Sequence, residues 1–543
     1  MRTKCSTALP VLAMGLLLAG MKVPSAGSQT PAQPTVPAYP AGTDSALGQR
    51  IAAILTDPAV ARAHWGIAVT TLSGVPLYGH DEAQFFRPAS NAKLFTTAAA
   101  MQLLGPQTTV PTEVIADSVT PEGLVSGDLW LRSDGDANLS GVVFPYVSVA
   151  GESGPPADPL RAINNLATQV AAHGVHHIAG NIVADDTQWT WEPYPQSWAI
   201  DDMLWDYGAP VSSLSVNDST IALTVHSGAR TGDPATVTQS PDVGFYTVNV
   251  QATTSAAKSQ TRIHVERTLG SRTVLITGEI ALGGKDVEQL AVSDPPLFAA
   301  QALRASLVAH GITVDGDAHA TERASTSPDG FTMQSHETVP DLPGPGEPPH
   351  NISEVCNDGC GATLAQRTSP PLVQDVLYTL KESQNLHAEQ LLRRLGRVYG
   401  REASDAQGTR VVRQFLVNAG LDGNDFIFYD GSGLSDHDLV TPRATAQLLA
   451  YASRQSWFPA WKASLPIAGV DGTLASRFKD SPLKGHIFAK TGTLGESRGL
   501  SGYVDCASGR QVIFSVYVDN HAPGGSADRT AMDRIVEAIA ASY

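Results

Sequence analysis

Three short motifs in this 543-residue chain combine side chains that could together acylate a serine. In chain order they are Ser90-Asn91-Ala92-Lys93, Ser383-Gln384-Asn385 and Lys490-Thr491-Gly492-Thr493. A serine hydroxyl is a weak nucleophile until a neighbouring base takes its proton, and a lysine with a lowered pKa can be that base. The trio therefore predicts a serine nucleophile, nearby proton carriers and a cationic strand for an anionic group.

The first motif, a serine and a lysine three residues apart, occurs four times, at Ser90/Lys93, Ser255/Lys258, Ser476/Lys479 and Ser481/Lys484. Only Ser90 follows a proline and opens a long apolar stretch, residues 88–104, which is typical of a helix. The spacing places Lys93 one turn from Ser90 on the same helical face. We expect Ser90 to be the nucleophile, Lys93 its base, and the Ser90 N–H an oxyanion donor. A capping serine with a solvent-reaching lysine is the alternative.

The second motif, Ser-x-Asn, occurs at residues 215–217 and 383–385. The earlier copy lies in a strand-like segment, whereas the later copy interrupts a helical region, so we assign Ser383 and Asn385 to the site. The Ser383 hydroxyl can relay a proton to a leaving amine, and the Asn385 amide can bind both the substrate peptide and Lys93. The alternative role for Ser383 is a helix N-cap.

The third motif occurs once, in the strand-like segment at 488–493. Gly492 has no side chain, so an extended substrate can lie close against the strand. Lys490 supplies a positive charge, and Thr491 and Thr493 supply hydroxyls, for a substrate carboxylate. The Thr493 N–H would also complete an oxyanion hole with that of Ser90. The alternative is an exposed edge strand with an ordinary lysine. The turn at 430–433 is expected to shape a loop near this site.

The elements around the motifs predict an α+β fold with a large β-rich insertion. Strand-like runs near both chain ends predict one antiparallel sheet with helices on its faces. The expected organisation is a signal peptide at 1–27, a Pro-rich leader at 28–42, a main domain in two parts at 43–111 and 366–543, an insertion at 112–320 with an inner module at about 220–284, and a linker at 321–365.

The N-terminus has the pattern of an export signal. Arg2 and Lys4 precede an apolar run at 8–18, and small residues follow at 25–27. The run is short for a membrane span, so we expect a soluble periplasmic protein after cleavage, with an uncleaved anchor as the alternative. A net charge of −17 without a Lys/Arg run argues against a nucleic-acid partner.

Cysteine and histidine positions do not form a metal-binding pattern. In an exported protein Cys356 and Cys360 are the natural disulfide pair, although the sequence leaves open whether they are bonded. Cys506 is then expected to be free and buried. The cluster of His173, His176 and His177 is expected to be solvated. We therefore expect no metal and no cofactor.

From about residue 45 to its end the chain resembles the class C low-molecular-mass penicillin-binding proteins, a group of D-Ala-D-Ala carboxypeptidases and endopeptidases. The resemblance rests on the segments RPASNAKL, GDLWLRSDGDANLS, SQNLHAEQLLRRLG, DGSGLSDHDLVTPRATAQLL, GVDGTLASRF and AKTGTLGESRGLSGYV. It implies a penicillin-binding/serine β-lactamase-like transpeptidase domain whose insertion corresponds to the group's two extra domains. The implied functional residues are Ser90, Lys93, Ser383, Asn385, Lys490 and Thr491.

The resemblance also implies an acidic residue in the insertion that helps bind the diamino-acid side chain of the substrate, and Asp186 in ADDTQW is the match. Two departures from the group are the segment GDANLS and the excursion at 321–365. The excursion has no counterpart that would suggest its role.

Together these features predict a serine D,D-peptidase that acts on peptidoglycan peptides through an acyl-enzyme on Ser90 and is inhibited by β-lactams at the same serine. One alternative is a peptidoglycan-binding protein without hydrolytic activity. Another is a β-lactamase or esterase on the same fold. The sequence leaves open the balance between carboxypeptidase and endopeptidase action and the oligomeric state.

Overall fold

The structure of the protein, a computed structural model, describes residues 38–39, 45–148, 158–340, 342–343 and 361–543. Its main sheet is built from both ends of the chain, as predicted. In spatial order the strands are β2 (Pro76–His80), β1 (His64–Thr71), β22 (Gln511–Asp519), β21 (Ser497–Asp505) and β20 (Ile487–Leu494), and all neighbours are antiparallel.

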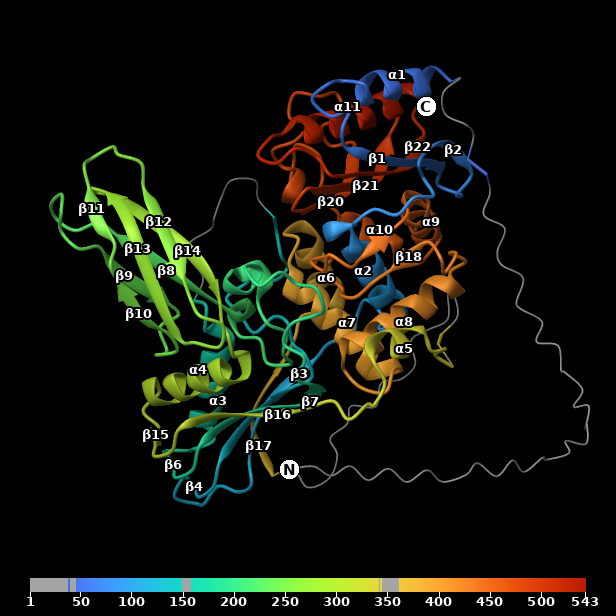
Figure 1. Cartoon of the computed structure of the whole chain (residues 1–543). Coiled ribbons are helices and arrows are strands. Elements are labelled where there is room, and N and C mark those ends of the chain that lie inside the picture. The colour runs from blue at the N-terminus through green and yellow to red at the C-terminus, as the bar shows by residue number, and fades with distance from the viewer. Residues whose placement is uncertain (1–37, 40–44, 149–157, 341, 344–360) are drawn as a thin grey trace, which may run out of the picture. The chain divides into compact units, whose positions relative to one another are not determined.

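Helices cover both faces of this sheet, which explains why its central strands are almost continuously apolar. On one face lie α1 (Ala46–Leu55) and α11 (Ala527–Ser542), where Ile51 and Ile535 share a core with Val69 and Val516 of the strands (Figure 1). On the other face α9 (Pro442–Ala452) packs against β1 and β22. The α+β architecture expected from the sequence is therefore confirmed.

Helix α2 (Ala92–Leu103) is buried along its whole length at the centre of a helical layer. The surrounding elements are α5 (Phe331–His336), α6 (Leu372–Lys381), α7 (Asn385–Tyr399), α8 (Asp405–Asn418), α10 (Phe458–Ala463), β18 (Phe426–Ile427) and β19 (Leu439–Val440). The helical region at 371–399 is broken between α6 and α7, where the sequence placed Ser383.

The intervening region forms a second sheet with the spatial order β16-β7-β5-β3-β17. These strands are β16 (Ala318–Arg323), β7 (Ile182–Thr190), β5 (Leu129–Ser133), β3 (Pro111–Ala116) and β17 (Ala362–Thr368). Helices α3 (Arg161–Ala172) and α4 (Pro295–Ala309) pack with it, and a smaller sheet contains β15 (Thr313–Val314), β6 (His177–Ile178) and β4 (Leu124–Val125). The boundary expected at residue 366 falls inside β17, which pairs with β3.

Residues 220–291 form two further sheets. One has the order β14-β8-β9, with β14 (Lys285–Ala291), β8 (Thr220–His226) and β9 (Thr236–Ser240). The other contains β10 (Thr247–Val250), β13 (Thr273–Ala281), β11 (Thr253–Ser255) and β12 (Arg262–Glu266). Figure 1 shows these strands together in green.

The remaining predictions concern the N-terminal segments, the cysteines and the membrane. The signal peptide, the leader apart from residues 38–39, and the pair Cys356 and Cys360 lie outside the described residues. Cys506 is free and buried, as predicted. Within the part of the chain that the structure describes, no helix is long and apolar enough to cross a membrane.

Candidate active site

Ser90 lies in a tight turn that leads directly into α2. The turn is the short 3-10 helix Ala89–Asn91, and Ala89 has a left-handed φ of 47°, a strained conformation for a residue with a side chain. A Cβ on Gly433 would lie only 1.8 Å from the Ala89 carbonyl oxygen, and Gly433 itself has a φ of 81°. A glycine on a neighbouring loop thus allows that loop to press against the turn that carries Ser90.

The amino group of Lys93 contacts the hydroxyl of Ser90 and two further oxygen atoms. Lys93 Nζ lies 2.9 Å from Ser90 Oγ, 2.6 Å from Asn385 Oδ1 and 2.8 Å from the carbonyl oxygen of Ser432. An amide or peptide oxygen can only accept hydrogen bonds. A neutral Lys93 therefore directs its two N–H groups at Asn385 and Ser432, and its lone pair remains for the hydroxyl proton of Ser90.

Burial determines the charge of this lysine. Lys93 is fully buried, and the loss of hydration lowers its pKa to about 7, although Asp430, Glu389 and Asp438 act in the opposite direction. A base with a pKa near neutrality combines a useful fraction of the unprotonated form with enough basicity to take a proton. Lys93 therefore has the position and the pKa of a general base for Ser90.

The loop at residues 430–435, named here the acceptor loop, holds the Ser432 carbonyl against Lys93. The carboxylate of Asp430 accepts hydrogen bonds from the backbone N–H groups of Ser432, Gly433, Leu434 and Ser435. From α7, Glu389 accepts from the N–H groups of Gly431 and Ser432 at 2.9 and 2.8 Å. The prediction that this turn shapes a loop near the site is confirmed.

Ser383 and Lys490 form a second pair beside the first. Lys490 Nζ donates to Ser383 Oγ and to the carbonyl oxygen of Thr491, both at 2.8 Å. Ser383 has a left-handed φ of 61°, which turns the chain sharply between α6 and α7. Burial, and then the charge of Lys93, lower the pKa of Lys490 well below its usual value, with Glu382 opposing. The charge of Lys93 thus disfavours the charged form of Lys490.

The start of α7 is held by a hydrogen bond and ion pairs that the sequence did not predict. Asn385 Nδ2 donates to the carbonyl oxygen of Tyr207 at 2.8 Å. Two residues on, the buried imidazole of His387 lies 2.5 Å from Asp375 and 3.3 Å from Asp218. Burial alone lowers the pKa of His387, but the two carboxylates raise it to about 10. Because Asp218 is 169 positions away in the chain, no local pattern could have revealed this pairing.

Strand β20 packs directly against the turn that carries Ser90. A Cβ on Gly492 would lie 2.8 Å from the carbonyl oxygen of Pro88 and 3.1 Å from the backbone nitrogen of Ser90. Gly492 is therefore required for contact between the strand and the turn, a reason different from the substrate approach inferred from the sequence. Thr491 Oγ1 lies 2.7 Å from Thr473 Oγ1 on the outer side of the strand.

A cavity of about 300 Å³ opens beside Ser90. It is lined by Ser90, Ser383, Thr473, Arg477, Thr491, Gly492, Thr493, Arg498, Gly499, Arg529 and Met532. Residues of all three motifs thus meet at one opening, with the amino group of Lys93 bonded to Ser90 and that of Lys490 bonded to Ser383. The arginines were not predicted, because their sequence positions do not show which face of β21 or α11 lines the cavity.

Asp186 is the predicted site residue that neither lines this cavity nor belongs to the hydrogen-bonded group of Lys93, Asn385 and Lys490 beside it. It lies on β7 and is buried, and its carboxylate accepts hydrogen bonds from the backbone N–H and hydroxyl of Ser213 at 2.9 and 2.6 Å. Burial raises the pKa of Asp186 to about 6, although these hydrogen bonds oppose the shift. Asp186 therefore holds the segment around Ser213 in this structure.

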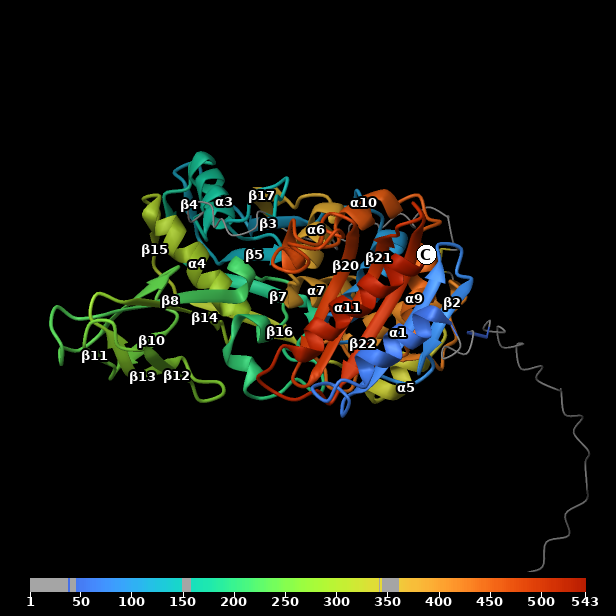
Figure 2. The ribbon, with the colours of Figure 1, turned by 90° about the horizontal axis from the view of Figure 1, so that it is seen from above.

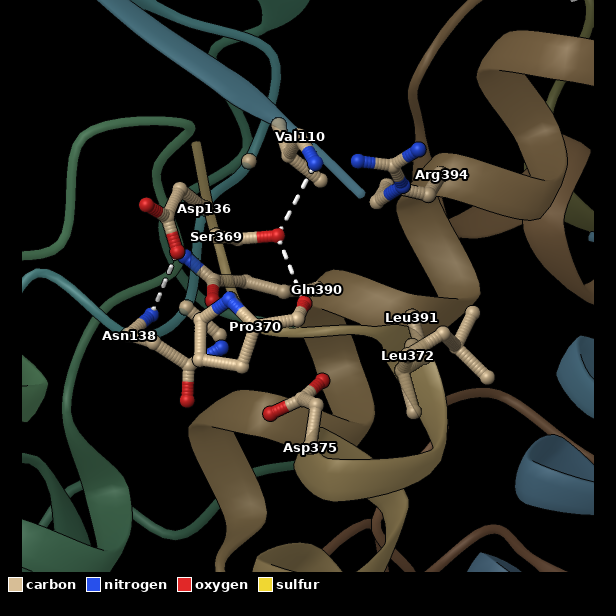
Figure 3. Close-up of a pocket in the computed structure, with 12 residues that line it drawn as sticks. Val110, Asp136, Asn138, Ser369, Pro370, Leu372, Asp375, Gln390, Leu391 and Arg394 are labelled. Atoms are coloured by element: carbon tan, nitrogen blue, oxygen red, sulfur yellow. Dashed lines mark hydrogen bonds between the residues drawn. The ribbon is translucent and has the colours of Figure 1, made fainter. Parts of the chain in front are cut away.

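A small pocket lies between α7 and the loop that carries Asp136 (Figure 3). Its volume of about 20 Å³ has room for roughly one water molecule. Among the described residues, Asn138 Oδ1, Gln390 Oε1 and Arg394 Nε have no hydrogen-bond partner in the protein. One buried water bonded to these groups would satisfy them.

Comparisons with known proteins agree with this geometry. A model described as the D-Ala-D-Ala carboxypeptidase 3 (S13) family matches residues 47–340 and 351–541. The D-alanyl-D-alanine carboxypeptidase of Actinomadura sp. (strain R39) is 31% identical over 506 residues, which cover 91% of this chain and 84% of that protein. The D-alanyl-D-alanine carboxypeptidase DacB of Haemophilus influenzae is 23% identical over 465 residues, with 84% and 85% covered.

A solved structure shows the same fold. Penicillin binding protein 4 (dacB) from Haemophilus influenzae superposes with a TM-score of 0.72 at 20% sequence identity, covering 90% of this chain and 98% of that one. This likeness confirms the penicillin-binding fold with extra domains that the sequence resemblance implied. The family model and the Actinomadura relative both match most of this chain. The chain therefore belongs to the D-Ala-D-Ala carboxypeptidase 3 (S13) family.

Proposed function

We propose that this chain is a serine D,D-peptidase that cleaves D-Ala-D-Ala-type peptides of peptidoglycan through an acyl-enzyme on Ser90. The observation that carries the proposal is the contact of 2.9 Å between Ser90 Oγ and the fully buried Lys93 Nζ. Membership of the D-Ala-D-Ala carboxypeptidase 3 family supplies the substrate class.

In the first step, neutral Lys93 takes the hydroxyl proton while Ser90 Oγ attacks the carbonyl carbon of the penultimate D-Ala. The negative charge that develops on the carbonyl oxygen is held by the N–H groups of Ser90 and Thr493, which line the same cavity. Because Asn385 and Ser432 fix Lys93 from behind, the amine needs little rearrangement to accept the proton.

In the second step, the amide C–N bond breaks and its nitrogen receives the proton that Lys93 took up, relayed through the hydroxyl of Ser383, which Lys490 holds at 2.8 Å. Lys490 and Thr491 bind the carboxylate of the departing D-Ala. Water then attacks the ester of Ser90 with Lys93 again as the base, which releases the shortened peptide and restores the free serine.

A β-lactam should enter the same site and acylate Ser90. Ring opening leaves the cleaved amine attached to the acyl group, so it cannot diffuse away as D-Ala does. A structure of the Haemophilus influenzae penicillin binding protein 4 holds a β-lactam, which supports this expectation for a chain of the same fold.

We further propose that the chain is exported to the periplasm after removal of residues 1–27. In this proposal the transpeptidase-like domain comprises residues 43–111 and 366–543, and the insertion at 112–320 forms walls around the cleft. The hydrogen bond from Asn385 to the Tyr207 carbonyl, which joins motif and insertion, supports this organisation.

Release of D-Ala from a short acyl-D-Ala-D-Ala peptide tests the function directly. We expect release by the wild-type protein and a loss of at least about a thousandfold in Ser90→Ala. Ser255→Ala, in another copy of the Ser-x-x-Lys spacing, is the matched control and should retain activity. Undiminished release in Ser90→Ala would contradict the assignment. Failure to release D-Ala would favour a binding protein if added penicillin stays intact, and a β-lactamase if the drug is destroyed.

A further inference from the structure

One end of the cavity beside Ser90 is lined by three arginines from separate elements. Arg477 follows the 3-10 helix Gly472–Leu474, Arg498 lies on β21, and Arg529 lies in the first turn of α11. Figure 2 shows α11 lying over the main sheet, where it contacts β21 and β22, which explains how a helix at the chain end reaches this cavity. These three residues are named here the arginine end.

Two of the arginines are held in place by carboxylates of α11. Arg498 pairs with the buried Asp528, and Arg477 Nε donates to Asp533 Oδ1 at 3.0 Å. Arg529, by contrast, is exposed. Among the described residues that line the cavity, none is acidic. The arginine end therefore presents guanidinium groups to the cavity, while the paired carboxylates belong to residues outside its lining.

The arginine end is joined to the strand that should bind the leaving group. Arg498 Nη1 donates to Thr493 Oγ1 at 3.2 Å, and Thr491 on the same strand is assigned to the carboxylate of the departing residue. Ser90, these two threonines and the arginines line the same cavity. Through the contact of Arg498 with Thr493, the arginine end thus adjoins the strand that is assigned to the leaving group.

The charge at this end is permanent, unlike that of the motif lysine. A guanidinium remains protonated at any pH at which the protein is folded, whereas a buried lysine loses its proton readily. Lys490 is fully buried and lies near a second lysine, and its pKa is lowered accordingly. The arginines therefore attract an anion to this side of the cavity whether or not Lys490 is protonated.

We propose that the arginine end binds a second carboxylate in the leaving group, so that the enzyme prefers leaving residues with an acidic side chain or stem peptides with a further carboxylate. This inference rests on the proposed peptidase function and deepens it. The same bonds form and break as in the release of D-Ala: Ser90 Oγ bonds to the carbonyl carbon, the amide C–N bond breaks, and the leaving nitrogen takes up a proton. Only the residue that departs is different.

The test compares acyl-D-Ala-D-Glu with its neutral isostere acyl-D-Ala-D-Gln, using kcat/KM at low ionic strength. We expect a preference for D-Glu of about fivefold, the size of one solvent-accessible ion pair, and a decline of this preference with added salt. Arg529→Gln should reduce the ratio to about one. Arg534→Gln makes the same charge change on α11 at a position that pairs with Asp57 outside the cavity, and should keep the ratio.

A wild-type ratio near one, or a ratio that Arg529→Gln leaves unchanged, would overturn the proposal. Arg498→Gln gives an independent check, because it removes the guanidinium that contacts Thr493 and should also lower the ratio. If acyl-D-Ala-D-Ala is cleaved but D-Glu and D-Gln react equally, only this inference fails. If none of the peptides is cleaved, the peptidase function and this inference fail together.

Discussion

The indole nitrogen of Trp198 donates a hydrogen bond to Asp430 Oδ2 at 2.9 Å. Trp198 belongs to the insertion and packs with Leu434, whereas Asp430 organises the acceptor loop whose Ser432 carbonyl holds Lys93. One contact thus links the inserted region to the base of the nucleophile. The insertion therefore helps to position Lys93, in addition to any role as a wall of the cleft.

Loss of this contact should slow acylation. Trp198→Phe keeps an aromatic ring but removes a donor to a carboxylate, which costs about 2 kcal/mol of unfolding free energy. We expect penicillin acylation to slow by about tenfold, measured by stopped-flow fluorescence, because Lys93 is held less firmly. Trp457→Phe removes a similar hydrogen bond, to Gln102, and is the matched control. Equal acylation rates in the two variants would show that the Trp198 contact is only structural.

The pKa of Lys93 sets the pH dependence of acylation. Only neutral Lys93 can take the proton of Ser90, so the acylation rate should rise with pH through about 7, the value to which burial lowers its pKa. Lys93→Arg keeps a cation that cannot act as a base at these pH values and should abolish acylation. A rate that is flat between about pH 5.5 and 8.5 would contradict this role of Lys93.

The His387 ion pairs should make stability depend on pH. The pKa of His387 is raised above its unfolded value, to about 10, so its contribution is complete below about pH 6.5 and is lost as pH rises toward 10. His387→Gln should lower the unfolding free energy by about 3–5 kcal/mol near neutral pH, because the buried Asp375 and the partly buried Asp218 lose their cation.

Urea unfolding at several pH values measures this dependence. The wild-type protein should lose stability between about pH 6.5 and 10 more steeply than His387→Gln does. The control His486→Gln breaks an exposed pair with Asp505 and should cost less than about 1 kcal/mol. Parallel pH profiles for wild type and His387→Gln would show that the imidazole is not charged in the folded protein.

Gly492→Ala should impair the nucleophile turn. The new Cβ would lie 2.8 Å from the Pro88 carbonyl, so β20 or the turn must move. Such overpacking costs about 1–3 kcal/mol, and we expect acylation of Ser90 to slow by about tenfold or more. A Cβ on Gly330 meets no heavy atom within 4 Å, so Gly330→Ala is the control and should leave acylation unchanged. Wild-type rates in Gly492→Ala would show that this contact does not position Ser90.

Local sequence patterns predicted the elements and the motif-bearing turns. The apolar stretch after Pro88 became α2, the interruption at Ser383 became the break between α6 and α7, and strands from both ends paired in one sheet. Each of these features is set by periodicity or by a few adjacent residues. This is why a single sequence was sufficient to predict them.

The contacts that complete the site were not predictable in the same way. His387 meets Asp218, and Trp198 meets Asp430, across 169 and 232 positions of the chain. Their pairing depends on how the insertion docks, which no local pattern encodes. Asp186 shows the reverse case, because a matching segment placed it in the site while the structure directs its carboxylate to Ser213.

The central claim is that Ser90 is the nucleophile of a penicillin-sensitive peptidase. The most direct measurement is incubation of the mature protein with a fluorescent penicillin, followed by peptide mass spectrometry to locate the label. We expect one stable adduct, on Ser90, in the wild-type protein and no adduct in the Ser90→Ala variant. A label on another serine, or no label with the drug left intact, would contradict it.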